Sequence, residues 1–280
     1  AVMCSAGILS GLAKERYDIV DCQQFPYIPA LASAVACRIS GTPLVVTWHE
    51  VWGDYWYKYL GIPGAAGKFL ERVLARHSVF PVAVSETTRE DLHPLIPGRD
   101  IEVIPNGIDL AGIDSVPPAG TKSDIIFVGR LIREKHVEVL IDAVGILKNQ
   151  YPGIRCLIIG GGPERWNLEM KARQMGLSDH ITFTGFLRES REVIAHMKSS
   201  RVFVLPSTRE GFGMAALEAL ACGIPVVTID HPKNASRVFV RNGCGALSAL
   251  DGKDLADKIA EMMSRESGRT SRYRMMVSGY

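Results

Sequence analysis

The sequence Ser-Thr-Arg-Glu-Gly-Phe-Gly-Met-Ala-Ala-Leu-Glu-Ala-Leu-Ala-Cys-Gly-Ile-Pro occupies residues 207–225. It lies between two short apolar runs, residues 202–205 and 226–229, and each run predicts a buried β-strand. Apolar residues recur with helical spacing over residues 213–222, and the glycine and proline that follow end the pattern. The stretch therefore predicts a strand, a tight loop, a helix and a second strand, which is the repeating unit of a parallel α/β sheet.

The loop and the first helical turn carry the features of a ligand site. Gly211 and Gly213 allow the backbone to come close to a ligand, and the unpaired N–H groups of the first turn favour an anion. Glu210 lies directly before this turn and Glu218 about two turns further along. Because carboxylates accept hydrogen bonds from neighbouring hydroxyl groups, this spacing suits a phosphate with a polyol on each side. A nucleotide sugar has this chemistry.

The bulk composition excludes several classes of protein. The chain has 280 residues, 47% of them hydrophobic and 22% charged, and a net charge of +2, so we expect one or two globular domains and no nucleic-acid partner. No apolar run reaches the roughly 18 residues that a membrane span requires. Six cysteines form no CxxC pair and no cluster with histidine. We expect them to be reduced, as in the cytoplasm.

The rest of the chain repeats the alternation of strand and helix, which predicts doubly wound parallel sheets. Residues 110–123 interrupt this rhythm, because they are rich in glycine and proline and lack periodicity. We take them as an interdomain linker and expect one domain over residues 1–115 and a second over residues 116–280. Residues 1–14 predict the end of a helix, and the last twelve residues predict a frayed end.

Polar residues follow several of the predicted strands, at the sheet edge where ligands bind in open α/β folds. His49 ends the strand at residues 44–48, and Arg130 and Lys135 follow the strand at residues 124–128. The last two predict a cationic site for phosphate.

Together these segments resemble the retaining GT-B glycosyltransferases, and more narrowly glycosyltransferase family 4, the glycosyl transferases group 1. The pattern Glu-x7-Glu from Glu210 to Glu218 is the most specific match. Pro-Asn-Gly-Ile-Asp at residues 105–109, Gly129-Arg130 with Lys135, His49, and Ala-Val-Ser-Glu at residues 83–86 follow the family order. The resemblance covers about residues 15–265 and implies two Rossmann-like domains, an acceptor-side domain first and a nucleotide-sugar domain second.

The resemblance also implies the reaction and the role of each matched residue. The reaction is metal-independent transfer of a glycosyl group from a nucleoside-diphosphate sugar, UDP more often than GDP, to a lipid, glycan or small molecule. Glu210 would bind the hydroxyls of the donor sugar, Glu218 the ribose, and His49 would face the reacting sugar from the first domain. The remaining donor-binding residues would be Arg130 and Lys135 at the diphosphate, Gly211, Phe212, Gly213 and Met214 at the helix start, and Gly160, Phe186 and Leu187 near the base.

The resemblance further implies that the first domain is incomplete. Family members have a strand with a Gly-Gly loop and two further βα units before the segment that matches residues 18–24, and we do not find them in this sequence. A sugar-nucleotide-binding module without turnover is therefore kept as an alternative. A GT-B epimerase or phosphorylase, which would keep the fold and change the reaction, is a second one. No cofactor and no metal are expected.

The aromatic residues 52–59 remain open to three interpretations. We expect a packed loop, while stacking on an acceptor sugar and contact with a membrane interface are the alternatives. The last would place the protein peripherally at the inner face of the membrane.

Overall fold

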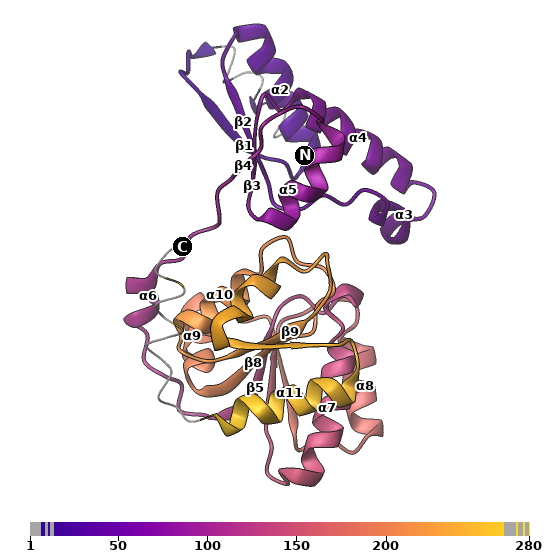
Figure 1. The fold of residues 1–280 in the computed structure, drawn as a ribbon, viewed down its shortest axis with the longest axis vertical. Helices are drawn as coiled ribbons and strands as arrows, with labels where there is room; N and C mark the ends of the chain where they lie inside the picture. Colours follow the sequence, from indigo (N-terminus) through magenta and orange to yellow (C-terminus); the bar gives the residue numbers. More distant parts are fainter. Residues whose placement is uncertain (1–6, 9–10, 12–13, 266–272, 274–276, 278–279) are drawn as a thin grey trace. The chain divides into compact units, whose positions relative to one another are not determined.

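The computed structural model describes residues 7–8, 11, 14–265, 273, 277 and 280. We expected the end of a helix at residues 1–14 and a frayed end over the last twelve residues. Most of these two segments lie outside the described residues. The chain divides into two compact units, Ala1–Asn106 and Gly107–Tyr280. Each unit is an α/β layer structure (Figure 1), which confirms the predicted fold class.

The first unit is built on a parallel sheet with the order β1-β2-β3-β4 among the described residues. Helices α2 and α4 pack on one another and α5 packs beside β3 and β4. Its elements are β1 (Val20–Gln23), α2 (Tyr27–Ser40), β2 (Leu44–Trp48), α3 (Tyr55–Leu60), α4 (Gly64–His77), β3 (Phe80–Ala83), α5 (Glu86–Leu92), η1 (His93–Leu95) and β4 (Glu102–Val103).

Trp48 and Trp56 lie in the core of this unit, together with apolar residues of α2 and α4. The ring of Trp56 lies 4.6 Å from that of Trp52 and 5.7 Å from that of Tyr27, measured between centroids. The expected aromatic loop at residues 52–59 is therefore wrong in part, because residues 55–60 form the short helix α3. Helix α3 is too short to show a helical period in the sequence. The packing of its Trp56 in the core stabilises it in place of intrinsic helix propensity.

The second unit has a parallel sheet with the order β10-β9-β8-β5-β6-β7 among the described residues. Its elements are α6 (Leu110–Asp114), β5 (Ser123–Val128), η2 (Arg133–Lys135), α7 (Val137–Gln150), β6 (Cys156–Ile159), α8 (Arg165–Gln174), β7 (Ile181–Gly185), α9 (Ser190–Lys198), β8 (Ser200–Leu205), α10 (Met214–Ala221), β9 (Val226–Ile229), η3 (Ala235–Gly243), β10 (Gly245–Ser248) and α11 (Gly252–Ser264).

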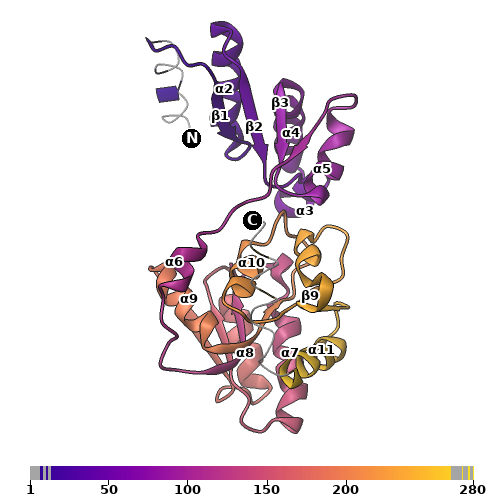
Figure 2. The same cartoon turned by 60° about the vertical axis from the view of Figure 1, so that its left-hand side comes forward.

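The handedness of the crossovers distributes the helices over both faces of this sheet. From β5 the chain moves through β6 to β7, and from β8 it moves the opposite way through β9 to β10. Because βαβ crossovers are right-handed, α7 and α8 cover one face and α10 the other. Helix α11 packs on α7, and α9 and η3 pack on α10. Figures 1 and 2 show the strands of this unit between the two groups of helices.

Two features of the second unit differ from the sequence-based expectation. Residues 110–123 begin with the helix α6, whose N-cap Asp109 accepts a hydrogen bond from the N–H of Gly112 at 2.8 Å. Helix α6 packs on α10, so this segment belongs to the second unit, and the boundary between the units lies in the chain between residues 106 and 107.

Among the helices that the structure describes, none combines the length and the apolar character that a membrane span requires.

Candidate functional site

The switch point of the second sheet brings two loops together. Strands β5 and β8 are neighbours, and the chain leaves them in opposite directions. Loops at the carboxyl ends of two such strands form the crevice in which open α/β folds bind ligands. Arg130 and Lys135 follow β5, and Glu210 follows β8. The topology therefore places three of the predicted site residues at one edge of the sheet.

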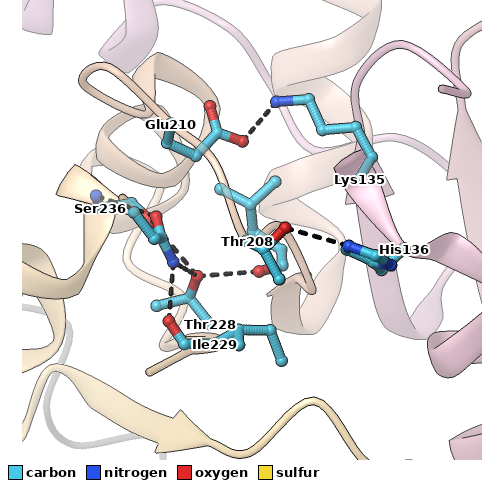
Figure 3. Close-up of polar contacts among 9 residues, drawn as sticks. Lys135, His136, Thr208, Glu210, Thr228, Ile229 and Ser236 are labelled. Atoms are coloured by element: carbon cyan, nitrogen blue, oxygen red, sulfur yellow. Dashed lines mark hydrogen bonds and ion pairs between the residues drawn. The ribbon is translucent and has the colours of Figure 1, made fainter. Parts of the chain in front are cut away.

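Lys135 and Glu210 meet at this edge of the sheet. The ammonium Nζ of Lys135 forms an ion pair with Oε1 of Glu210, as Figure 3 shows. The side chains are only 15% and 12% exposed, so both charges are largely removed from water. Arg130, in contrast, is exposed. The pair sets a cation beside a carboxylate. This combination suits a ligand whose anionic part would contact the cation and whose hydroxyl groups would donate hydrogen bonds to the carboxylate.

His136 connects the two loops a second time. Its ring Nε2 lies 3.0 Å from Oγ1 of Thr208 and its Nδ1 lies 3.0 Å from Oε1 of Glu138 (Figure 3 shows the first contact). The backbone N–H of Thr208 also donates to the carbonyl of Glu134 at 3.2 Å. His136 has a φ of 46°, in the left-handed region that costs a side-chain-bearing residue roughly 1–2 kcal/mol. Tertiary contacts therefore hold a strained backbone directly after Lys135.

The backbone of Glu210 is fixed from the other side by the segment after β9. Its N–H donates to the carbonyl of Lys233 at 3.0 Å, and its carbonyl accepts from the N–H of Ala235 at 2.9 Å. Between these two, the buried amide of Asn234 donates to Oγ1 of Thr228 at 2.9 Å. Glu210 is thus held by its own main chain while its carboxylate points at Lys135.

The start of α10 depends on Gly213. Its φ is 95°, and a Cβ at this position would lie 2.6 Å from the Cβ of Ser236. The glycine therefore allows the helix to begin at Met214 close to η3. The ring of Phe212 is 7% exposed and lies 5.3 Å from the ring of Phe239, so Phe212 packs in the core and offers a ligand only its backbone.

Glu218 lies on α10 and lines a pocket of about 390 Å³. The pocket is lined by α6 and the residues next to it, by the first turns of α9, and by Met214. Burial raises the pKa of the Glu218 carboxyl. Within the part of the chain that the structure describes, no side chain forms an ion pair with it. The carboxylate is therefore available to accept hydrogen bonds from a ligand in this pocket.

Gly160, Phe186 and Leu187 lie at the same carboxyl edge, on the side of β6 and β7. Gly160 follows β6 with a φ of 137°, and a Cβ there would lie 1.9 Å from the carbonyl oxygen of Gly129. Its N–H donates to the carbonyl of Gly185 at 2.9 Å, so the three loops that end β5, β6 and β7 pack together. The ring of Phe186 is 80% exposed.

His49 belongs to the first unit, at the carboxyl end of β2. Its N–H donates to Oε1 of Gln24 at 2.9 Å and its carbonyl accepts from Oγ1 of Thr88 at 3.3 Å. The ring Nε2 forms a hydrogen bond with the side-chain oxygen of Gln23. Burial lowers the pKa of His49, so the neutral imidazole is favoured at neutral pH.

The residues that hold the predicted site residues in place were not predicted from the sequence. Gln24 could have been found, because it is a polar residue at the end of a predicted strand beside the strand of His49. His136, Thr208 and Asn234 gave no signal, since their roles come from contacts between loops far apart in the chain. Among the described residues no group of three or more His, Cys, Asp or Glu could hold a metal ion.

Comparison with known families matches nearly the whole chain. The family model for glycosyl transferases group 1 matches residues 113–277. The model for Glycosyltransferase Family 4 matches residues 3–111.

Three curated relatives come from mycobacteria. The chain is 29% identical over 187 residues to a GDP-mannose-dependent alpha-(1-6)-phosphatidylinositol monomannoside mannosyltransferase of Mycobacterium tuberculosis, covering 60% of the chain and 48% of the relative. It is 29% identical to a phosphatidyl-myo-inositol mannosyltransferase of Mycobacterium leprae, covering 89% and 65%. It is 34% identical to a D-inositol 3-phosphate glycosyltransferase of Mycolicibacterium smegmatis, covering 68% and 44%. The chain thus spans less than two thirds of each relative's length.

Solved structures confirm the GT-B fold. HepE of Anabaena, in complex with UDP and glucose, is 20% identical and superimposes with a TM-score of 0.80, covering 100% of this chain and 77% of that one. A sucrose-phosphate synthase of Thermosynechococcus elongatus is 20% identical with a TM-score of 0.82, covering 98% and 72%.

Proposed function

The chain belongs to the family of glycosyl transferases group 1, and from this premise we propose that the protein transfers a hexosyl group from a nucleoside-diphosphate sugar to an acceptor hydroxyl, retaining the anomeric configuration. The observation that carries the proposal is the meeting of Lys135 and Glu210 at the switch point of the second sheet. A cation for the diphosphate and a carboxylate for the sugar then lie side by side.

In this proposal each part of the donor has its own residues. Arg130 and Lys135 bind the diphosphate together with the N–H groups at the start of α10, from Gly211 to Met214. Glu210 binds the hydroxyls of the sugar. Glu218 accepts hydrogen bonds from the ribose, and its pocket supports this role. Gly160, Phe186 and Leu187 contact the base.

The reaction breaks the bond between the sugar C1 and the diphosphate oxygen and forms a bond between C1 and the acceptor oxygen. The acceptor loses its proton to the leaving diphosphate, on the face from which the diphosphate departs. Arg130 and Lys135 stabilise the charge that develops on the diphosphate, which removes the need for a metal ion or another cofactor. His49, with its neutral ring, faces the reacting sugar.

Donor preference is a finer part of the proposal. The resemblance to family 4 implies UDP more often than GDP, whereas a relative from Mycobacterium tuberculosis is named as GDP-mannose-dependent. UDP-hexoses and GDP-mannose should therefore be compared directly. Release of nucleoside diphosphate in the presence of acceptor measures turnover, and the anomeric proton coupling of the product shows whether configuration is retained.

Variants of the two glutamates test the proposed roles. We expect Glu210→Ala and Glu218→Ala each to lower kcat/KM by about 100-fold, since each removes a hydrogen-bonding carboxylate from the bound donor. Asp257→Asn, an exposed acid on α11, is the matched control and should leave turnover unchanged. Full activity of both glutamate variants would refute the assignment. Donor binding without turnover on any acceptor would instead identify a binding module, and a requirement for inorganic phosphate a phosphorylase.

The acceptor is proposed to be a lipid or a glycan, reached from the cytoplasmic face of a membrane. Support comes from exposed apolar residues on α3, α4 and the turn between them, where Ile62 is 89% exposed and Phe69 65%. Lys58, Arg72 and Arg76 on the same two helices are exposed cations that suit anionic lipid headgroups.

Vesicle sedimentation tests this contact. Ile62→Asp should release the protein from vesicles of phosphatidylglycerol, whereas Ile39→Asp, at a residue of α2 that is 81% exposed, should not. Equal binding of both variants would argue against the membrane contact and leave a soluble glycan as the acceptor.

A further inference from the structure

Glu71 is an acidic residue inside the apolar core of the first unit. It lies on α4, is 0% exposed, and is followed in the helix by the core residues Leu74 and Ala75. Within the described residues no lysine, arginine or histidine forms an ion pair with it. A buried carboxylate without a cation is costly unless hydrogen bonds stabilise it. The hydrogen bonds of Glu71 therefore identify the groups that its carboxylate holds in place.

Three donors converge on the Glu71 carboxylate. Oε1 accepts from the hydroxyl of Tyr27 at 2.9 Å and from the backbone N–H of Trp52 at 2.8 Å. Oε2 accepts from the backbone N–H of Gly53 at 2.8 Å. Two of the three donors belong to the loop between β2 and α3. Charge-assisted hydrogen bonds of this kind are about twice as strong as neutral ones.

This loop begins with His49. Gln24 holds its first residues, because it accepts from the N–H of His49 at 2.9 Å and donates to the carbonyl of Glu50 at 3.4 Å. Glu71 holds its last residues at Trp52 and Gly53. The indole N–H of Trp52 donates to Oε2 of Glu50 at 3.1 Å and links the two anchors. The loop is therefore fixed at both ends, and the anchor at its far end is a buried acid.

We propose that Glu71 is a positioning residue, which holds the loop over residues 49–53 so that His49 stays at the carboxyl end of β2. The inference rests on the proposed function, in which His49 faces the reacting sugar. Glu71 itself touches no substrate. Its effect on the reaction passes through the backbone of Trp52 and Gly53.

Two conservative variants separate positioning from plain structural support. Glu71→Gln keeps the shape of the side chain, but its amide group presents a donor to the N–H of Gly53 or of Trp52, so the loop loses an anchor. Tyr27→Phe removes the third hydrogen bond of Glu71 and leaves both loop contacts intact. Both variants lose stability. Only Glu71→Gln should lower kcat, by about 10-fold to 100-fold, because misplacement of a reacting group by about 1 Å has effects of that size.

A second readout does not depend on activity. Burial lowers the pKa of His49, so a loosened loop should admit water and raise it toward the ordinary value. NMR titration of the full chain, with the His49 signal assigned by its loss in His49→Gln, should show this rise in Glu71→Gln and not in Tyr27→Phe. If Glu71→Gln does not fold, Glu71→Asp takes its place with the same two measurements.

The outcomes are distinct. An unchanged His49 titration in Glu71→Gln, or an equal loss of kcat in Glu71→Gln and Tyr27→Phe, would overturn the positioning role. A wild-type chain that turns over no donor would refute the proposed function, and the titration would still test the anchor.

Discussion

The Lys135–Glu210 pair joins two loops of the second unit, and both residues are proposed to bind the donor. Each partner is about seven-eighths buried, so neither charge is well solvated without the other. Because the sequence separates them widely, their pairing could not be predicted, although both were predicted to bind the donor. What the sequence lacked was the adjacency of β5 and β8, which only the sheet order supplies.

Lys135→Met should destabilise the second unit by about 3 kcal/mol, the lower end of the range for breaking a buried pair, because it leaves Glu210 as an uncompensated charge. The double variant Lys135→Met with Glu210→Gln removes both charges and should recover most of this loss without recovering turnover. Urea unfolding followed by circular dichroism measures the difference. A double variant as unstable as the single one would contradict the account.

Glu218 should make stability and donor binding depend on pH in opposite directions. Its pKa is raised by burial, so its contribution to stability is present below the unfolded-state pKa and is lost as the pH rises through the folded-state pKa. Glu218→Gln should therefore be more stable than the wild type at neutral pH and equal to it in acid.

If Glu218 binds the ribose as proposed, binding of nucleoside diphosphate needs its ionised carboxylate. Affinity should fall by up to about tenfold per pH unit once the pH drops below the raised pKa of Glu218. Calorimetry over a pH series measures this, and Glu218→Gln corrects for titration of the diphosphate itself, whose second pKa is near 6. If the affinity of Glu218→Gln depends on pH in the same way as that of the wild type, Glu218 does not bind the nucleoside diphosphate.

At the scale of elements, long periodic segments were predictable and short ones were not. The helix expected at residues 213–222 is α10, Met214–Ala221, and both flanking strands are present. Helices α3 and α6 were expected as a loop and a linker, because six and five residues are too few to show a period. The N-cap Asp109 was the one local signal for α6.

Helix α6 is held by a side chain from another element. Nζ of Lys198, at the end of α9, donates to the carbonyls of Ile113 and Val116 at 2.7 Å each. Lys198→Met keeps the apolar stem and removes these bonds, so we expect a loss of about 1.5–3 kcal/mol and faster amide exchange in α6. Lys198→Arg, which keeps the charge and the donors, is the matched control. Unchanged exchange in Lys198→Met would show that α6 is held otherwise.

Because α6 encloses the pocket of Glu218, the same Lys198→Met variant should also weaken nucleoside-diphosphate binding. The loss in affinity should match the loss of order in α6 and be absent in the arginine variant.

At the scale of the whole molecule, the family match and the division into units predict where binding resides. Arg130, Lys135, Glu210 and Glu218 all belong to the unit Gly107–Tyr280, which has its own sheet and core, whereas His49 belongs to Ala1–Asn106. The two Rossmann-like sheets were predictable from the βα rhythm. The boundary between the units was expected after residue 115, whereas it lies after residue 106. The glycine and proline residues at positions 110–123 indicated a linker, and nothing in the sequence indicated that α6 packs on α10.

A polypeptide of residues 107–280 should therefore fold cooperatively and bind nucleoside diphosphate with an affinity within about tenfold of the whole chain, yet show no transfer. Thermal unfolding and calorimetry measure the first two properties. Trp166, the single tryptophan of this segment, gives an independent fluorescence signal for folding. A polypeptide that unfolds without a transition would show that the second unit depends on the first.

The anchor at Glu71 separates what holds the main chain of this turn from what selects its side chains. Glu71 recognises the main chain at residues 52 and 53, not their side chains, so it imposes no choice of residue at position 52. At position 53 the φ of 52° still favours glycine. The side chains of this turn are therefore constrained by their own packing, with Val51 in the core and Trp52 on Trp56, and not by the carboxylate that holds the main chain.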